Sequence, residues 1–414
     1  MINRILTLIF LCSVSFLQAQ VDQGLVTYIS FDDCTADESR GNPSIIGVMN
    51  LQDTICGCGV KGRALKLNGQ GDHVFIAGAV NSEFDRDDFT ISFYFKPVAN
   101  NSGGVQTLLY KSGEDCSTQS NFAVRYDPRA GFLNVQFVEN SNKSASINSF
   151  RVPEGSCWFH IVLARRNLKT ILYVNGELAA EVSASDRVDV RNDGVLTLGE
   201  SYCSATDRYF SGFLDELRIY NRALSKDEVG QLYFAPDKIL TQDTRVFLGE
   251  SFNVNIANTC ASDFLWTPTI GVDDSTAFDS DITPEAPGSF TYQLDFKDSD
   301  CTAFDTVRVI VIDPNSLDCE QVFMPSAFTP NSDGTNDVYG ISNPEIFVFG
   351  DAELSGFEIF DRWGNLVFQT VDPRETWDGF YKGQAVNPGV MLFKVRYTCQ
   401  GEEKVEVGSL TIIR

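Results

Sequence analysis

The sequence predicts an all-β protein in which sandwich domains follow one another along the chain. Short runs of alternating apolar and polar residues, broken by clusters of Gly, Asn, Asp and Ser, are typical of strands in such domains. Clear examples are residues 89–95, 132–138 and 170–176. One clear helical signal interrupts the pattern: Ser225 followed three residues later by Glu228 has the form of a capping box.

Two proline-containing breaks, at 236–238 and 313–318, divide the chain into three blocks. We name them the head (22–235), the middle module (238–315) and the C-terminal domain (318–414). The 414 residues of the chain are enough for domains of these sizes.

The first 19 residues have the pattern of a secretory signal peptide. Arg4 supplies a positive charge, residues 5–17 are almost wholly apolar, and Ala19 is a small residue at a plausible cleavage site. We therefore expect residues 1–19 to be removed on export. No later segment approaches the roughly 20 apolar residues that a membrane span needs, so we expect no span.

The charge and the cysteine count agree with an exported protein. The net charge of −24 makes nucleic acid a poor partner. The chain has 11 cysteines, and loss of Cys12 with the signal peptide leaves an even number. An oxidising compartment makes disulfides the expected state of the remainder.

Six ordered motifs in the head resemble the laminin G-like family, whose fold is a concanavalin-like jelly-roll sandwich. They lie at residues 25–32, 62–69, 89–93, 158–162, 172–177 and 212–225. Within them, Asn175-Gly176 predicts a type I′ hairpin turn. The family binds glycans or proteins through loops at one edge or on the concave face. Tyr126, Tyr202 and Tyr209 are candidate stacking residues for sugar rings, with ordinary sheet or loop positions as the alternative.

One carboxylate of the head, that of Asp215, is expected on an apolar face. Strand alternation places it on the same side as Phe213, Leu217 and Ile219. A buried carboxylate needs a partner. The resemblance implies a structural calcium ion, and further oxygen ligands would come from Asp32, Asp33 and Asp37. The alternative is that backbone amides of a neighbouring loop bind the carboxylate.

The head shows no catalytic motif. Asp215 and Glu216 are adjacent and are expected on opposite faces, and the two histidines, His73 and His160, lie in strand motifs. We therefore expect a binding protein and not an enzyme. Six cysteines fall in the head, and their pairing is left open among 15 connectivities. They are Cys34, Cys56, Cys58, Cys116, Cys157 and Cys203.

The middle module resembles the PKD-like and immunoglobulin-like sandwiches of secreted Bacteroidetes proteins. The motifs are residues 260–268, 287–292 and 300–312, with Trp266 expected in the core. Cys260 and Cys301 are the two cysteines of this block, so we expect them to pair. Such a bond closes a loop of about 40 residues and contributes roughly 3–4 kcal/mol. The module is expected to act as a spacer.

The C-terminal domain resembles the type B sorting domain of the type IX secretion system, also called the gliding motility-associated C-terminal domain. It too is expected to be a small β-sandwich. Its motifs occupy residues 325–339, 357–368, 377–379, 387–389 and 408–414. The motif positions that we single out are Pro330, Asn331, Asp333, Gly334, Asn336, Asp337, Arg362, Trp363, Gly364, Trp377, Asp378 and Gly379.

Two further features of the C-terminal domain lead to expectations. Residues 331–337 are rich in oxygen ligands like a calcium loop, but they lack its final Glu, so a turn held by side-chain hydrogen bonds is favoured. Cys319 and Cys399 are the remaining cysteines and are expected to pair.

Together these resemblances imply a protein of a Bacteroidetes-type bacterium that is exported through the periplasm by the type IX translocon and is secreted or held on the cell surface. The head would bind a polysaccharide or glycoprotein, as in adhesion. The alternatives are a polysaccharide-degrading enzyme or its accessory carbohydrate-binding component, and a surface scaffold without a ligand.

Overall fold

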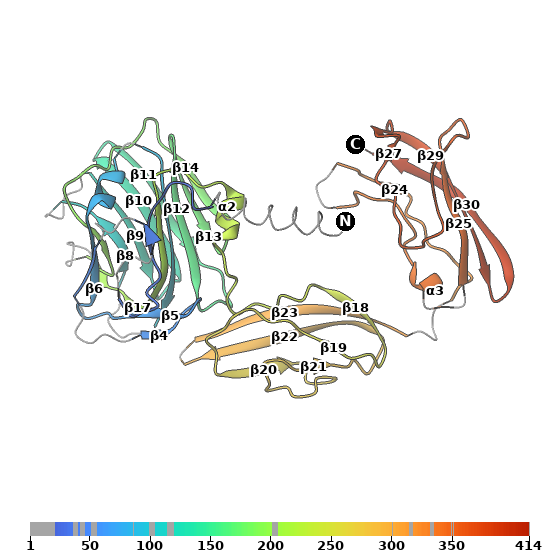
Figure 1. The fold of residues 1–414 in the computed structure, drawn as a ribbon, viewed down its shortest axis with the longest axis horizontal. Coiled ribbons are helices and arrows are strands. Elements are labelled where there is room, and N and C mark those ends of the chain that lie inside the picture. The colour runs from blue at the N-terminus through green and yellow to red at the C-terminus, as the bar shows by residue number, and fades with distance from the viewer. Residues whose placement is uncertain are drawn as a thin grey trace, which may run out of the picture. The chain divides into compact units, whose positions relative to one another are not determined.

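The chain folds almost wholly into β-sheets (Figure 1), as a computed structural model reveals. The structure describes residues 21–35, 40–41, 46–50, 56–85, 87–98, 104–113, 120–200, 206–299, 301–313, 318–331, 335–348, 350 and 352–413. The predicted signal peptide lies outside these residues. The chain forms two compact units. The first comprises Met1–Thr244, Asn253–Ile282 and Thr291–Arg308, and the second comprises Arg245–Phe252, Thr283–Phe290 and Val309–Arg414.

Two stacked sheets form the head. The first has the order β14 (Glu177–Ser183), β13 (Lys169–Val174), β12 (Phe159–Arg166), β7 (Phe89–Pro97), β17 (Ser211–Tyr220), β1 (Leu25–Ile29) and β2 (Arg40–Gly41), and β5 (Arg63–Asn68) joins β17 and pairs with β4 (Cys56–Cys58). The second has the order β11 (Lys143–Arg151), β10 (Phe132–Asn140), β9 (Asn121–Asp127), β8 (Gln106–Lys111), β15 (Leu196–Leu198), β6 (His73–Ala77) and β3 (Ile46–Asn50), with β16 (Arg208–Tyr209) beside β8. A short 3-10 helix, η1 (Ala79–Glu83), follows β6.

The inner faces of these sheets enclose one hydrophobic core, because alternate side chains of each strand point inward. Phe93 and Phe95 of β7 and Phe122 of β9 are among its fully buried members. The predicted all-β sandwich is thereby confirmed for the head.

Helix α2 (Lys226–Gln231) covers part of the outer face of the first sheet. Its predicted capping box is confirmed: the Ser225 hydroxyl accepts from the Glu228 amide and the Glu228 carboxylate accepts from the Ser225 amide. Val229 and Leu232 then pack against Tyr173 and other buried side chains of the sheet. Full burial of two such side chains stabilises by about 3–6 kcal/mol.

The turn between β13 and β14 is also as predicted. Asn175 and Gly176 have φ values of 52° and 81°, the positive values that a type I′ turn requires.

The middle module contains a four-stranded and a two-stranded sheet. The first has the order β18 (Thr244–Phe247), β23 (Cys301–Ile312), β22 (Gly288–Asp298) and β20 (Asp263–Thr267), and the second pairs β19 (Phe252–Asn253) with β21 (Asp281–Ile282). Trp266 is fully buried, as predicted, and its indole Nε1 donates to the carbonyl of Ala277 at 3.1 Å.

The C-terminal domain is built on a five-stranded sheet. Its order is β24 (Ala327–Phe328), β30 (Glu402–Ile412), β29 (Gly389–Cys399), β25 (Ala352–Phe360) and β26 (Leu366–Thr370), accompanied by the hairpin of β27 (Phe380–Tyr381) and β28 (Gln384–Ala385) and by helix α3 (Glu345–Val348). Tyr339, Phe357 and Trp377 lie in its core. In the described part of the chain, no helix has the length and apolar character needed to cross a membrane.

Candidate functional site

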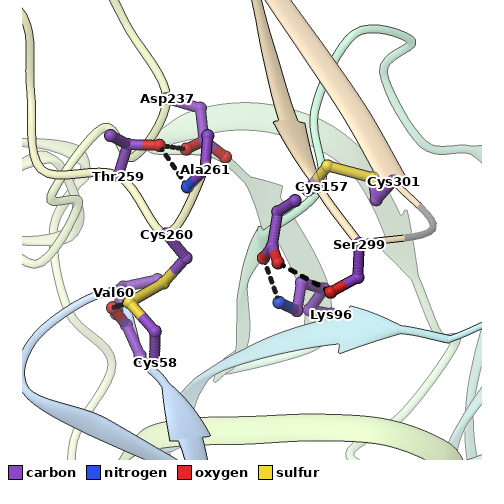
Figure 2. Close-up of polar contacts among 12 residues, drawn as sticks. Cys58, Val60, Lys96, Cys157, Asp237, Thr259, Cys260, Ala261, Ser299 and Cys301 are labelled. Carbon is purple, nitrogen blue, oxygen red and sulfur yellow. Dashed lines mark hydrogen bonds and ion pairs between the residues drawn. A yellow bond between two sulfur atoms is a disulfide. The ribbon is translucent and has the colours of Figure 1, made fainter. Parts of the chain in front are cut away.

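The disulfides correct one expectation about the middle module. Cys260 and Cys301 do not pair with each other: Cys58 bonds to Cys260 and Cys157 bonds to Cys301 (Figure 2). The physical reason lies in the strand order. β22 lies between β23, which begins at Cys301, and β20, which begins three residues after Cys260. Positions on β20 and β23 are therefore about 9–10 Å apart, beyond the roughly 7 Å that a disulfide tolerates between Cα atoms.

The other described cysteines pair within one block. Cys34 bonds to Cys56 inside the head. The predicted bond between Cys319 and Cys399 is confirmed. Cys116 and Cys203 of the head lie outside the described residues.

Further contacts accompany the two disulfides that join the head to the middle module. The Asn258 side chain donates to the carbonyl of Val60 at 3.0 Å, and the Phe304 amide donates to the carbonyl of Gly155 at 3.0 Å. All of these residues belong to the first unit. This part of the middle module is thus covalently bound to the head.

The prediction that Asp215 shares a face of β17 with Leu217 and Ile219 is wrong, whereas Phe213 and Asp215 do lie on the same face. A β-bulge between Asp215 and Arg218 shifts the register of β17 against β7, and Glu216 within it has a φ of 54°. Leu217 consequently points into the core, as does Ile219. Asp215, which the alternation grouped with them, binds the loop that precedes β5 instead.

The Asp215 carboxylate is fully buried against backbone amides. Its Oδ2 accepts from the amide of Val60 at 2.8 Å and more weakly from that of Lys61 at 3.5 Å. Its Oδ1 has no hydrogen-bond partner among the residues that the structure describes. Burial, with smaller contributions from the charges of Glu216 and Asp32, raises the pKa of Asp215 to about 8. The backbone-amide alternative therefore explains how Oδ2 is satisfied, but it provides no partner for Oδ1.

The other predicted calcium ligands are only partly assembled here. Asp32 Oδ1 accepts from the Arg63 amide at 3.0 Å, so it binds the same loop as Asp215. Asp33 lies next to it on the chain, and Asp37 lies outside the described residues. Among the residues that the structure describes, no group of three or more His, Cys, Asp or Glu is arranged to hold a metal ion.

A polar groove of about 570 Å³ lies at one end of the head. Four separate segments line it: the residues before β7, the β12–β13 turn, the segment after β14 and the segment after β17. The lining residues are Asp87, Asp88, Arg166, Asn167, Arg187, Asn221, Arg222 and Ala223.

Hydrogen bonds within the groove fix its side chains. Asp88 forms an ion pair with Arg187 and accepts from the Asn167 amide at 2.8 Å. Arg166 donates to the carbonyl of Leu224 at 2.6 Å. These bonds orient planar guanidinium and carboxylate groups in a shared hollow.

Arg165 lies buried beneath these residues. Its guanidinium donates to the carbonyls of Asp85, Asp87 and Val188, and it stacks over the Phe89 ring at 4.7 Å. Burial lowers its pKa to about 10. Arg165 therefore ties two groove segments to β12.

The aromatic and histidine candidates occupy mainly structural positions. Tyr126 is buried in the core, so it is not available for stacking on a sugar. The Tyr209 hydroxyl donates to Glu200 at 2.6 Å, and His73 Nδ1 lies 3.0 Å from the same carboxylate. His160 is fully buried. Tyr202 lies outside the described residues.

The motif loop at 330–337 is closed by its own hydrogen bonds. The Asn331 amide donates to Asp337 Oδ1 at 3.0 Å, and the Thr329 amide donates to the carbonyl of Asn336 at 2.8 Å. Pro330 lies between these bonded positions, and Asp333 and Gly334 lie outside the described residues. These bonds favour the turn that we expected.

The second motif forms the hairpin between β25 and β26. Asp361 Oδ1 accepts from the amides of Trp363 and Asn365, both at 2.8 Å, and Gly364 has a φ of 82°. Trp363 is 77% exposed, with the Arg362 guanidinium 5.2 Å from its ring centroid.

The third motif combines a core residue with a turn. The Trp377 indole donates to the carbonyl of Phe380 at 2.8 Å, and the Phe380 amide donates to Asp378 Oδ1 at 2.9 Å. Gly379 has a φ of 80°. Most motif positions thus have structural roles within the domain.

Comparison with known proteins identifies two of the three blocks. Residues 68–230 match the model of the Concanavalin A-like lectin/glucanases superfamily, and residues 322–412 match the CHU_C type IX secretion signal domain. A search of curated proteins found no match.

Several solved structures are also similar. Domain 4 of AbnA, a GH43 extracellular arabinanase from Geobacillus stearothermophilus, in complex with arabinotriose, is 22% identical, over 50% of this chain and 98% of that chain, with a TM-score of 0.39. The binding domain of Paraclostridial Mosquitocidal Protein 1 is 15% identical, over 93% of this chain and 89% of that chain, with a TM-score of 0.43. The Ruminococcus gnavus IT-sialidase CBM40, bound to alpha2,3 sialyllactose, is 18% identical, over 45% of this chain and 95% of that chain, with a TM-score of 0.33.

The chain therefore carries a laminin G-like, concanavalin-like domain and a type IX secretion signal domain, as the motifs predicted. The signal domain indicates export, with the product secreted or placed at the cell surface.

Proposed function

We propose that this exported protein is a non-catalytic binding protein whose head recognises a polysaccharide or glycoprotein, as in adhesion. The observation that carries the proposal is the polar groove, in which guanidinium, carboxylate and carboxamide groups from four segments meet. Sugars present arrays of hydroxyl donors and acceptors, and planar side chains that both donate and accept can match them.

The groove is well suited to binding because its side chains are already oriented. Arg187 is held by Asp88, and Arg165 anchors two of the groove segments from below. A preorganised site loses little conformational entropy when a ligand binds. The same bonds would keep the groove in shape on an exported protein in salt-containing water, because they are partly shielded from solvent.

The groove supports binding better than hydrolysis. Most glycoside hydrolases need two carboxyl groups about 5–10 Å apart on either side of the scissile bond. The carboxylates lining this groove, Asp87 and Asp88, are consecutive residues, and Asp88 is paired with Arg187. An accessory carbohydrate-binding role beside a separate enzyme would use the same groove.

A glycan array probed with the full mature chain tests the proposal. We expect binding to polysaccharide or glycoprotein glycans, and at least a tenfold loss in the Arg166→Gln variant, which removes a guanidinium group from the lining of the groove. Arg129→Gln is the matched control because Arg129 lies on the exposed β9–β10 turn. An array without any bound glycan would refute the glycan proposal. Equal losses in both variants would refute the groove as the site.

We further propose that calcium binds beside Asp215. The buried Oδ1 of Asp215, which has no hydrogen-bond partner among the described residues, fits a cation, and Asp32, which binds the same loop, adds a second carboxylate. Asp33 and Asp37 are the remaining candidate ligands. Calcium would supply positive charge that offsets the cost of burying the Asp215 carboxylate.

Melting temperature with and without chelator tests the calcium proposal. An ion present at about 100 times its Kd raises stability by about 2.7 kcal/mol, so the head should melt several degrees higher in calcium than in chelator. Asp215→Asn should remove that difference. Identical melting curves in calcium and in chelator would contradict the proposal.

A further inference from the structure

Two lysines flank a phenylalanine on the outer face of the first sheet. In the strand register, Phe213 of β17 lies directly opposite Lys66 of β5 on one side and Lys96 of β7 on the other. Directly opposed residues of neighbouring strands have Cβ atoms about 5 Å apart. The ammonium groups lie 5.7 Å and 4.4 Å from the ring centroid, respectively. The sequence therefore builds a row of cation, aromatic ring and cation.

The charge of Lys96, the lysine of this row that lies on β7, is neutralised by the middle module. Lys96, labelled in Figure 2, is only 6% exposed. It forms an ion pair with Asp298, at the end of β22. Its ammonium also lies 5.3 Å from the Trp158 ring centroid. Its charge is thus compensated within the protein.

The charge of Lys66, the lysine of this row that lies on β5, is not compensated by an ion pair among the described residues. Lys66 has no hydrogen bond or ion pair among the described residues, and its ammonium lies over the Phe213 ring. A lysine held over an aromatic ring loses part of its water without gaining a counter-charge. An anion entering beside it would supply that charge.

A pocket of about 370 Å³ opens beside this row, within the range of small-ligand sites. One wall comes from the head and the other from Asp298, Ser299 and Cys301 of the middle module, all within the first unit. Cys58 and Cys301 line the pocket themselves, so the two disulfides that join the modules also hold its walls together.

We propose that this pocket binds an acidic sugar residue, with its carboxylate at Lys66 and its ring against Phe213. The Phe213 ring lines the pocket and offers apolar contact to the C–H groups of a sugar, and the uncompensated ammonium of Lys66 selects a negative charge. The site is separate from the groove of the proposed function. The groove lies before the first residue of β7 and the pocket lies at the last residues of the same strand, roughly 25–30 Å away for an extended strand of that length.

Saturation-transfer NMR and titration with glucuronate, glucose and inorganic phosphate test the proposal on the full mature chain. Glucuronate should bind at least tenfold more tightly than glucose, and phosphate should not displace it. Lys66→Gln should weaken glucuronate binding at least tenfold. Lys169→Gln should not, because Lys169 is exposed on β13 and paired with Glu181.

The variants also separate this site from the groove. Arg166→Gln should leave glucuronate binding at the pocket unchanged, so the pocket can stand if the groove proposal fails, and the reverse holds for Lys66→Gln. An unchanged melting temperature in Lys66→Gln shows that the fold is intact. Absence of glucuronate binding, equal binding of glucose or phosphate, or full binding by Lys66→Gln would each overturn the proposal.

Discussion

Lowering the pH from 8 to 5 should destabilise the head through His160. This side chain is fully buried on β12, where its Nε2 hydrogen-bonds with the Ser92 hydroxyl at 2.8 Å. Its ring stacks on those of Tyr94 and Tyr233, with centroids 4.4 Å and 6.0 Å away. Burial, with a smaller contribution from the charge of Arg218, lowers its pKa to about 3.

The magnitude follows from proton linkage. In the unfolded chain a histidine has a pKa of about 6.5, so the unfolded state binds the extra proton between about pH 6.5 and 3 while the folded state excludes it. Stability therefore falls as the pH falls through this window. At pH 5 the unfolded imidazole is almost fully protonated, and His160 alone costs the head about 2 kcal/mol relative to pH 8.

Urea unfolding of the full chain at pH 8 and pH 5 measures this effect, compared between the natural protein and His160→Gln. Glutamine does not titrate, and the other titrating groups are common to both chains, so they cancel in the difference. The pH-dependent loss should be smaller in the variant by about 2 kcal/mol. Equal losses in the two chains would show that His160 does not exclude a proton, and the reasoning from burial would be refuted.

Three substitutions test other parts of the fold. Asn192→Ala removes an acceptor 2.9 Å from the fully buried Lys111 ammonium, and the loss should be about 2–4 kcal/mol in urea unfolding, whereas no change would mean that water replaces it. Gly62→Ala would place a Cβ 2.0 Å from Asp32 Oδ1 at a φ of 63°, so the head should melt several degrees lower; an unchanged melting temperature would count against this loop geometry. Trp377→Ala should cost about 3–5 kcal/mol and leave the chain in the periplasm, and normal secretion with a normal melting curve would contradict its core role.

Local sequence signals predicted local structure well. The capping box at Ser225 and the turn at Asn175-Gly176 depend on residues within four positions of one another, and both are confirmed. Trp266 was likewise recognised as a core residue. In each case the residue type limits the backbone or the burial by itself, so neighbouring residues suffice for the prediction.

The missed features depend on contacts between distant residues. The bulge in β17 needs a left-handed φ at Glu216, a conformation that a glutamate in the sequence does not predict. The Glu216 carboxylate is held in place by a hydrogen bond from Tyr28 and an ion pair with Arg218. Strict alternation therefore placed Asp215 on the same face as Leu217 and Ile219, which the bulge puts on the opposite face. The groove and the lysine row also join segments far apart in the sequence, which only the sheet order brings together.

The pairing of Cys260 with Cys301 was predicted wrongly for the same reason, and the observed pairs lead to a prediction about force. Cys58–Cys260 shortens the covalent path from the head to the end of the middle module by 202 residues, and Cys157–Cys301 shortens it by 144. Tension applied to the ends of the chain therefore passes first through Cys58–Cys260. Replacing both cysteines of this pair with serine transfers the load to the other disulfide. The difference of 58 residues should lengthen the fully extended chain by about 20 nm. Single-molecule stretching under oxidising conditions measures this length, with the reduced natural chain as the control that extends further than both. Equal lengths for the natural and variant chains would show that Cys58–Cys260 carries no load.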